Sequence, residues 1–399
     1  MINSLNYNPS TIEYLQEVGM RKISLLIVLM FCGALFSQNL GSRGLLHTQS
    51  ARTFEKGQLE VHTNMNFFTK VTEYLGSDPQ VEQDFSAVNY WLVASNLAVT
   101  YGIIDNLDFT IAPRLYQDTH YKNEYNIPDD IFLTLKAGSF GFLRRHMYGG
   151  MLMNIRLATG EQHNYPFTEY ASGAIEYGFK GALSYFMDPY LPDRSLNMHL
   201  NLGWWNHNEA GEVLYKYANG TEAKASTNSS ELQYAFGLSY PTSMFNFNLE
   251  ANGIAYLTEP DPEVYSRENW FYLTPSVKYK PTSWFSVDLG IDIRLTGDDN
   301  TTSGVPNKTS EDFDLPNYAP WKVHLGLNLR ILPLATSPQT AAEIERDEFQ
   351  KRVDFFQKIV EDRAHSEDVQ EELKQLIEER EEAEKELEEL KRILEEEGK

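Results

Sequence analysis

The chain has 399 residues, of which 57 are Asp or Glu and 34 are Lys or Arg, and its net charge at pH 7 is -23. This charge excludes sequence-independent nucleic-acid binding, because such binding depends on neutralising phosphates with basic groups. Mean hydropathy is -0.44, and no stretch reaches the roughly 20 apolar residues of a membrane-spanning helix. A helical membrane protein is therefore excluded. A membrane β-barrel is not, because polar and apolar residues alternate along its strands and keep the averaged hydropathy low.

One long apolar run, residues 23–36, follows a short basic segment and precedes Ser37. A basic start, a short apolar core and a small residue at the exit predict a secretory signal peptide that is cleaved after Ser37. Residues 1–37 are thus expected to form a leader and signal peptide. Translation is expected to begin at Met20, with an extended signal sequence as the alternative.

The single cysteine, Cys32, lies inside this apolar core and follows Phe31. A lipidated cysteine would need a small residue at that preceding position, so lipidation is disfavoured. The mature chain is then expected to have no cysteine, which excludes disulfides, thiolate zinc sites and cysteine nucleophiles.

From about residue 57, apolar and polar residues alternate with a period of two in twelve separate runs. In the clearest run, Trp321, Val323 and Leu325 share one face, and Lys322 and His324 share the other. This alternation predicts strands with one apolar face. The predicted strands span residues 57–72, 89–103, 107–118, 130–139, 147–159, 171–187, 196–208, 230–240, 244–258, 269–280, 284–297 and 319–332.

The connections between these strands alternate between long and short. Long polar connections follow odd-numbered strands and short ones follow even-numbered strands; examples are 73–88, 209–229 and 298–318 against 104–106, 241–243 and 281–283. Short turns at one rim, long loops at the other and an even strand number are typical of bacterial outer-membrane barrels. Residues 38–335 are therefore predicted to form an all-β transmembrane barrel in the cell outer membrane, with both chain ends in the periplasm.

Two further features of the strands lead to expectations. Pro113 and Pro275 lie inside predicted strands and predict bulges or broken pairing, because proline lacks the ladder N–H. Aromatic residues cluster near strand ends and predict interfacial girdles. They are Tyr90, Trp91, Trp204, Trp205, Trp270, Phe271, Tyr272 and Trp321 near the loops, and Trp284 and Phe285 near a turn. A soluble β-sandwich is disfavoured by the long strands, their twelvefold repetition and the secretion signal.

The charged residues in the polar phase of the strands are predicted to face the barrel lumen. They are Glu60, Asp108, Arg114, Lys136, Arg156, Glu176, Lys180, Glu250, Asp288, Asp292, Arg294, Lys322 and Arg330. Six acids against seven bases are nearly balanced, whereas a strongly selective pore is expected to show one sign at its constriction. Two interpretations remain open: a pore for small solutes and a plugged barrel that acts as an anchor.

Residues 339–399 differ sharply from the rest and carry 22 acidic and 11 basic side chains. Apolar residues at steps of four and three predict a coiled-coil seam, interrupted by Arg380, that consists of Val369, Leu373, Leu376, Ala383, Leu387, Leu390 and Leu394. A break near residues 365–368 leaves a helical hairpin and one long stuttered helix as alternatives. Such a thin apolar stripe needs a partner, so we expect homo-oligomerisation or a periplasmic partner.

No motif in the chain indicates catalysis, a cofactor or a metal site. His120 and His163 lie in predicted loops without the local pattern of an outer-membrane lipase or protease. The loop acids Glu259, Asp261, Glu263, Asp298 and Asp299 lack the spacing of a calcium-binding loop. They are expected to keep the loops soluble or to meet divalent ions of the lipopolysaccharide layer.

Residues 38–335 resemble Gram-negative outer-membrane β-barrel proteins, including porins, and the exit at Ser37-Gln38 resembles signals of the Bacteroidota type. The stretch GLLHTQSARTFEKGQLEV, residues 44–61, resembles the first-strand region of the barrel half of OmpA-like proteins. Their globular peptidoglycan-binding domain has no counterpart in the charged tail. The resemblance implies a porin-like passive channel for small solutes. The alternative is an envelope anchor whose coiled-coil tail oligomerises or tethers the outer membrane to a periplasmic partner.

Overall fold

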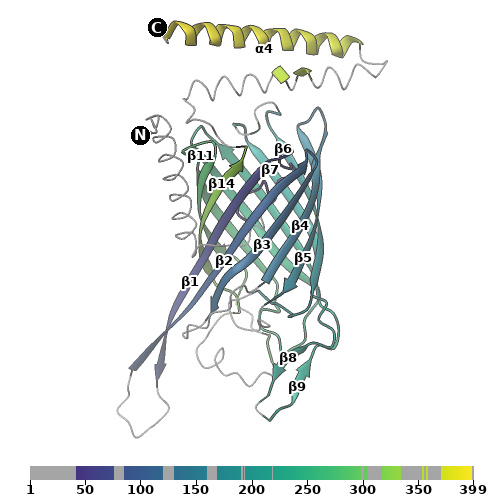
Figure 1. The fold of residues 1–399 in the computed structure, drawn as a ribbon. Helices are drawn as coiled ribbons and strands as arrows, with labels where there is room; N and C mark the ends of the chain where they lie inside the picture. The colour runs from purple at the N-terminus through teal and green to yellow at the C-terminus, as the bar shows by residue number, and fades with distance from the viewer. Residues whose placement is uncertain are drawn as a thin grey trace, which may run out of the picture.

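A computed structural model describes most of the barrel and parts of the tail (Figure 1). The described residues are 42–75, 85–119, 130–159, 169–189, 192, 194–217, 219–297, 301–303, 317–333, 353–354, 356–357 and 370–397. The predicted leader with Cys32 and the loop histidines His120 and His163 lie outside these ranges.

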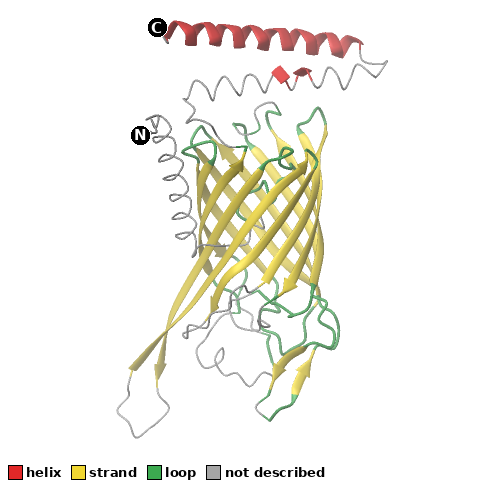
Figure 2. Cartoon of the chain, in the orientation of Figure 1, coloured by secondary structure: helices red, strands yellow, loops and turns green. Residues whose placement is uncertain are grey.

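Twelve antiparallel strands close into a barrel in which each strand pairs with its neighbours along the chain and β1 pairs with β14 (Figure 2). The strands are β1 Leu59–Leu75, β2 Phe85–Ile104, β3 Leu107–Thr119, β4 Asp130–Phe142, β5 Met147–Ala158, β6 Glu176–Phe186, β7 Asn197–Asn206, β10 Ser230–Pro241, β11 Phe245–Thr258, β12 Trp270–Tyr279, β13 Phe285–Arg294 and β14 Trp321–Leu332. The twelve predicted strands are thus confirmed. The structure adds a short hairpin, β8 Val213–Lys216 with β9 Glu222–Lys224, inside a long connection that was predicted as loop.

The two rims of the barrel differ as the connection lengths predict. The turn rim carries the short connections and the end of β14, and the loop rim carries the long connections and the β8–β9 hairpin (Figure 1). The start of β1 and the end of β14 therefore both lie at the turn rim.

Side chains alternate between the lumen and the barrel exterior along each strand. In β7, Asn201 is 1 % exposed while the next residue, Leu202, is 56 % exposed. Large apolar side chains are likewise exposed along several other strands, for example Met151 in β5 and Leu289 in β13. An apolar exterior and a polar interior are what a barrel in a lipid bilayer requires.

The expected aromatic girdle is found at the turn rim, where Trp284 is exposed, but several of the aromatic residues expected at the loop rim face inward. Trp205, Trp270 and Tyr272 are buried, so the expectation that they belong to an interfacial belt was wrong. Their alternation phase directs them inward, which nearness to a strand end does not indicate. Most exposed aromatic residues of the described strands flank the turn rim: Tyr101, Phe140, Phe142, Tyr185, Tyr240, Phe245, Tyr279 and Trp284.

Both strand prolines coincide with interrupted pairing, as expected. The β2–β3 register shifts between Ser95 and Asn96, close to Pro113 on the facing strand. The β12–β13 pairing omits Pro275 and resumes at Ser276. In each case the missing N–H falls where the ladder is irregular.

The segment that precedes β1 differs most from expectation. Residues 44–61 resemble a first-strand region, and the first strand was predicted to begin at residue 57, but β1 begins at Leu59. Residues 42–58 instead fold inside the barrel, where Leu46, Thr48 and Ala51 are at most 2 % exposed. We call residues 42–58 the lumenal hairpin.

The described part of the tail contains helix α4, Gln370–Glu397. Ala383 of α4 packs against Val353 and Phe356. Roughly 30 residues of straight helix would separate these groups by about 40 Å, so one straight helix does not account for the contact. This contact favours the helical hairpin over the single long helix.

Two predicted seam residues, Ala383 and Leu387, are buried, and the side chains of the other five lie outside the described set. Pairing with a second chain as a coiled coil stays a prediction. None of the helices that the structure describes has the length and apolar character needed to cross a membrane.

We expect the exterior of the barrel to reject charge in a depth-dependent way. Leu202→Arg lies midway along β7 and should lower the free energy of unfolding in lipid vesicles by about 2–4 kcal/mol. Leu257 has a similarly exposed side chain but lies near the loop rim, so Leu257→Arg should lower the free energy of unfolding by only about 0–1 kcal/mol. Denaturant titration measures both, and equal costs at the two positions would contradict a lipid-facing exterior.

Candidate functional site

The lumenal hairpin enters the barrel from the turn rim and folds back on itself. At its tip Gly44 bridges Gln49, and the Leu45 N–H donates to the Thr48 carbonyl at 2.8 Å. Its second arm returns to the turn rim, where the Gly57 N–H donates to the carbonyl of the β2 residue Gly102. The tip therefore lies deep in the lumen and both arms lie near the turn rim.

The tip is held by one carboxylate from β11. Glu250, which is 0 % exposed, accepts hydrogen bonds from three consecutive backbone N–H groups, those of Leu46 at 2.9 Å, His47 at 2.9 Å and Thr48 at 2.7 Å. Because the acceptor is charged, these bonds are stronger than those between neutral groups. They replace the strand pairing that the irregular tip lacks.

Other wall side chains bind the backbone of the second arm. Asn201 of β7 accepts from the Gln49 N–H at 2.6 Å and donates to the Gln49 carbonyl at 2.8 Å. Ser184 of β6 accepts from the Ala51 N–H at 2.7 Å. Wall side chains thus bind the main chain of the arm. Any hairpin sequence of suitable size has these main-chain groups, whereas the wall needs particular polar residues at these positions.

Near the turn rim an acid and a base hold the two arms together. Asp108 of β3 accepts hydrogen bonds from the Phe54 N–H at 2.9 Å and the Ser42 hydroxyl at 2.8 Å. Lys136 of β4 donates to the same Ser42 hydroxyl at 2.9 Å. Asp108 and Lys136 are both fully buried, so each depends on the other and on the hairpin for its polar contacts.

Wall glycines make room for the hairpin. A Cβ on Gly138 would lie 2.3 Å from the Ala51 carbonyl oxygen, and one on Gly290 would lie 2.4 Å from a Leu46 methyl carbon. A side chain at Gly138 would collide with backbone, which cannot move aside as a flexible side chain can. The wall is shaped to receive the hairpin at these points.

The hairpin lies between two cavities. The loop-side cavity, about 170 Å³, is lined by His47 of the hairpin, by wall residues of the strands and by loop residues such as Tyr170. The turn-side cavity, about 330 Å³, is lined by hairpin residues that include Arg43 and Leu45. The barrel wall alone does not fill the lumen, and the hairpin occupies the space between the two cavities.

A chain of buried charges lines the loop-side cavity. Arg156 donates to Asp130 at 2.5 Å and lies 3.7 Å from Glu176. Glu176 also accepts from the Trp205 ring N–H at 2.8 Å and lies 3.1 Å from Nδ1 of His207. These groups link β4, β5, β6 and β7, so opposite charges are paired along the wall and not segregated.

His207, which follows the end of β7, is held in its charged form by this network. Burial alone would lower its pKa, but the Glu176 carboxylate beside Nδ1 and the Glu231 carboxylate 3.8 Å from Nε2 raise the pKa of His207 to about 10. The group therefore carries a positive charge at neutral pH.

The predicted lumen-facing charges all lie on the interior face. Four of them contact the hairpin: Asp108, Lys136, Glu250 and Asp292. Seven line a cavity: Arg114, Arg156, Glu176 and Lys180 on the loop side, and Glu60, Asp288 and Arg330 on the turn side. The remaining two, Arg294 and Lys322, contact the Tyr318 carbonyl and Asp292, respectively.

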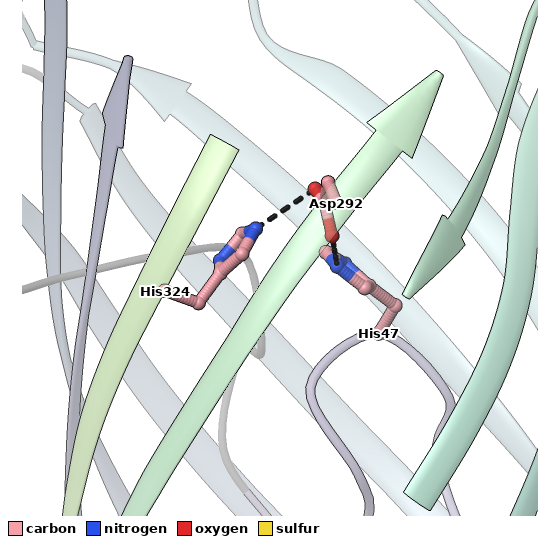
Figure 3. A group of neighbouring side chains, drawn as sticks. All are labelled: His47, Asp292 and His324. Carbon is pink, nitrogen blue, oxygen red and sulfur yellow. Dashed lines mark hydrogen bonds and ion pairs between the residues drawn. The ribbon is translucent and has the colours of Figure 1, made fainter. Parts of the chain in front are cut away.

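The lumenal histidines were not among the predicted site residues. His324 and His62 lie in the polar phase of their strands, so alternation could have found them, whereas His47 lies in a segment without alternation. Two of these histidines, His47 and His324, meet the predicted residue Asp292 at the hairpin tip (Figure 3). Nε2 of His47 lies 2.8 Å from Oδ1 of Asp292, and Nε2 of His324 lies 2.8 Å from Oδ2 of Asp292.

Comparisons with known proteins find solved structures of low similarity, which carry no argument about this chain. No family model and no curated protein matches the chain. Among solved structures, the chain is similar to the NanC porin at 12 % identity and a TM-score of 0.41, over 68 % of this chain and all of that one. An outer membrane channel from Pseudomonas putida F1 gives 8 % identity and 0.41, over 70 % and 98 %. A FadL homologue from Pseudomonas aeruginosa gives 9 % identity and 0.35, over 75 % and 97 %.

A disulfide should form between the hairpin tip and the wall when Thr48 and Gly237 are both replaced by cysteine in a Cys32→Ser background. A Cβ on Gly237 would lie 3.2 Å from the Thr48 Cβ, close to the roughly 3.5–4.5 Å of disulfides. Gel migration before and after reduction, with mass spectrometry, measures the bond. Thr48→Cys paired with Gly220→Cys in the β8–β9 loop is the control, and bond formation in the control alone would contradict the hairpin's position.

The charge of His207 can be followed by its imidazole nitrogen shifts in detergent-solubilised protein. Because its pKa is raised, the stabilisation from its charge is fully present below pH 6.5 and is lost as the pH rises through about 10. We expect the ring to stay protonated at pH 8. A titration midpoint near 6.5 would contradict the contacts with Glu176 and Glu231.

Proposed function

We propose that the protein is an outer-membrane channel for small solutes, and that the lumenal hairpin closes it in the state described above. The observation that carries this proposal is the position of the hairpin between two cavities in the lumen. A barrel whose wall side chains filled the interior would leave nothing to move. Here the obstruction is a single segment whose tip lies deep in the lumen and which is connected to the barrel through β1.

The hairpin is held by non-covalent contacts. No covalent bond joins its described residues to the wall, and deep in the lumen its backbone is held mainly by hydrogen bonds to side chains such as Glu250, Asn201 and Ser184. The ion pair of His47 with Asp292 and the packing of Ala51 against Leu152 and Ala182 add to these bonds. Each bond stabilises the closed state by about 1 kcal/mol net, and by up to about 3 kcal/mol where the acceptor is charged. Together they favour closure strongly, so opening is a rare event and a permanently open porin is not the state that we propose.

The solute class follows from the charges of the lumen. Acids and bases are nearly equal in number and are paired with one another, as in Arg156 with Asp130 and Lys322 with Asp292. No single sign dominates, so the field along the path discriminates weakly between anions and cations. We therefore propose small polar solutes without a strong preference for charge.

The second candidate is an envelope anchor, in which the hairpin never leaves the lumen. The buried pair Asp108 and Lys136, which both contact Ser42, favours it because removing the hairpin would leave two buried charges with fewer partners. In that case the tail, with its buried Ala383 and Leu387, would carry the function by binding a second copy or a periplasmic partner. Contacts with lipid and lipopolysaccharide are expected for either candidate.

Conductance across planar bilayers separates the two candidates. The Thr48→Cys/Gly237→Cys protein should be silent when oxidised and should return to wild-type behaviour when reduced. Glu250→Gln should raise the open fraction by about tenfold, because weakening three charge-assisted bonds removes on the order of 1.4 kcal/mol of closure. Glu231→Gln is the matched control, since it removes a buried lumenal carboxylate that does not hold the hairpin tip.

Two outcomes would overturn the gated channel. An oxidised protein that conducts like the reduced one would show that the hairpin does not close the path. Silence of the wild type, the reduced double-cysteine protein and Glu250→Gln alike, in correctly folded barrels, would favour the anchor.

A further inference from the structure

We infer that His47, Asp292 and His324 form a binding site for a divalent transition-metal ion of the zinc type, at the point where the hairpin tip meets strands β13 and β14. The three residues come from separate parts of the chain and converge on one point (Figure 3). Their candidate ligand atoms all lie within 4.8 Å of one another.

The site is enclosed by the barrel. The side chains of Asp292 and His324 are at most 1 % exposed and that of His47 is 5 % exposed. The two imidazole rings lie edge to face, with centroids 5.1 Å apart. Each ring directs its Nε2 atom at a different oxygen of the Asp292 carboxylate. The arrangement thus presents two nitrogen donors and one carboxylate donor to a common point.

An unsatisfied contact inside this cluster points to a ligand. His324 is 0 % exposed, yet neither of its ring nitrogens has a hydrogen-bond partner among the described residues. Nε2 of His324 and Oδ2 of Asp292 face each other at 2.8 Å without the geometry of a hydrogen bond, and neither atom has a hydrogen-bond partner, although the Lys322 ammonium lies 3.3 Å from Oδ2. Buried polar atoms are normally paired, and two lone-pair donors aimed at each other are what a metal ion between them would satisfy.

The donor set selects the class of metal. Imidazole nitrogen with one carboxylate suits zinc, iron, nickel and copper, whereas calcium and magnesium prefer oxygen ligands. Zinc binds nitrogen and oxygen at about 2.0–2.2 Å, which places tetrahedral ligands roughly 3.3 Å apart. The two contacts of 2.8 Å therefore need to widen by roughly 0.5 Å, which small side-chain rotations supply.

Most contacts of Asp292 are compatible with a role as a metal ligand, but the positive charge of Lys322 opposes it. Thr274 of β12 donates its hydroxyl to Oδ1 of Asp292 at 2.7 Å, as outer-shell residues do for ligating carboxylates. Lys322 lies 3.3 Å from Oδ2 and competes with a cation for it. The ammonium of Lys322 is held to one side over the Tyr272 ring, 4.6 Å from its centroid. Three protein ligands leave a fourth position free, and His47 also lines the loop-side cavity, which provides room for it.

A metal ion at this point would hold the lumenal hairpin in its closed position. Two ligands belong to the barrel wall and the third, His47, belongs to the hairpin tip, next to the backbone bonds that Glu250 accepts. The ion stabilises the closed state because the site is complete only when the tip is in place. This latch rests on the gated channel proposed above, whereas binding of the ion does not.

Binding is tested first, on full-length protein purified without a polyhistidine tag and treated with a chelator. Calorimetric titration with Zn²⁺ should give one site per chain, and Co²⁺ should give the visible absorption bands of a four-coordinate nitrogen and oxygen site. His47→Gln, Asp292→Asn and His324→Gln should each weaken binding by about 100-fold or more. His199→Gln is the matched control, because His199 is also a buried lumenal histidine but bonds to Ser184.

Lys322→Met separates a metal site from a mere ion-pair cluster. If Asp292 binds a metal ion, removing the competing ammonium strengthens Zn²⁺ binding. Absence of Zn²⁺ binding by the wild type, or equal binding by the wild type and His324→Gln in barrels that migrate as folded protein, would overturn the site. Loss of binding in His199→Gln to the same degree as in His324→Gln would overturn it too.

The latch is tested separately in planar bilayers. Zn²⁺ should lower the open fraction of the wild type by at least tenfold and should leave His47→Gln unchanged. If Zn²⁺ binds with one site per chain but the open fraction does not change, the latch is overturned and the metal site stands. If hairpin-dependent gating is seen without any Zn²⁺ binding, the metal site is overturned and the gated channel stands.

Discussion

The interior of this barrel depends on one interaction: the Glu250 carboxylate accepts hydrogen bonds from three consecutive backbone N–H groups of the hairpin tip. A chain segment without regular pairing can lie at membrane depth only if every backbone donor and acceptor finds a partner inside the protein. The hairpin tip has no strand beside it, so wall side chains must supply those partners. Glu250, Asn201 and Asp108 supply these partners by accepting hydrogen bonds from backbone N–H groups of the hairpin. The hairpin's conformation therefore depends on these wall residues as well as on its own.

The same constraint explains the composition of the wall. Where the hairpin approaches most closely, the wall has glycine, as at Gly138 and Gly290, and where its backbone needs a partner, the wall has a polar side chain. Several charges that do not touch the hairpin are paired with one another, as Arg156 is with Asp130 and Glu176 and as Arg330 is with Glu60, because an unpaired charge inside the lumen would be costly. The lumen is therefore better described as charges of both signs around an obstruction than as the lining of a selective pore.

The fold could be predicted from the sequence because alternation is a local signal. Each of the twelve strands shows it within about ten residues, and the phase of a strand decides which charges face inward, as for Lys136 and Asp292. The aromatic residues near the loop rim follow the same rule, and Trp270 was misplaced because its phase was not considered.

The hairpin could not be predicted in the same way. Its residues show no period, and its partners are remote in the chain: Leu46 and Glu250 are 204 positions apart. A resemblance to first-strand regions directed attention to residues 44–61 but assigned them the wrong structure. The cluster of His47, Asp292 and His324 was hidden for the same reason, because one member belongs to the aperiodic segment and the cluster exists only when the barrel closes around it.

Hydrogen exchange at the amides of Leu46, His47 and Thr48 tests the central claim, that the hairpin is bound inside the barrel through its backbone. In folded protein in lipid or detergent, these three amides should exchange as slowly as those of the neighbouring strand ladders, because Glu250 accepts them in a buried site. Exchange at the rate of an exposed loop would contradict the account, since it would place the hairpin outside the lumen or leave it unbound within it.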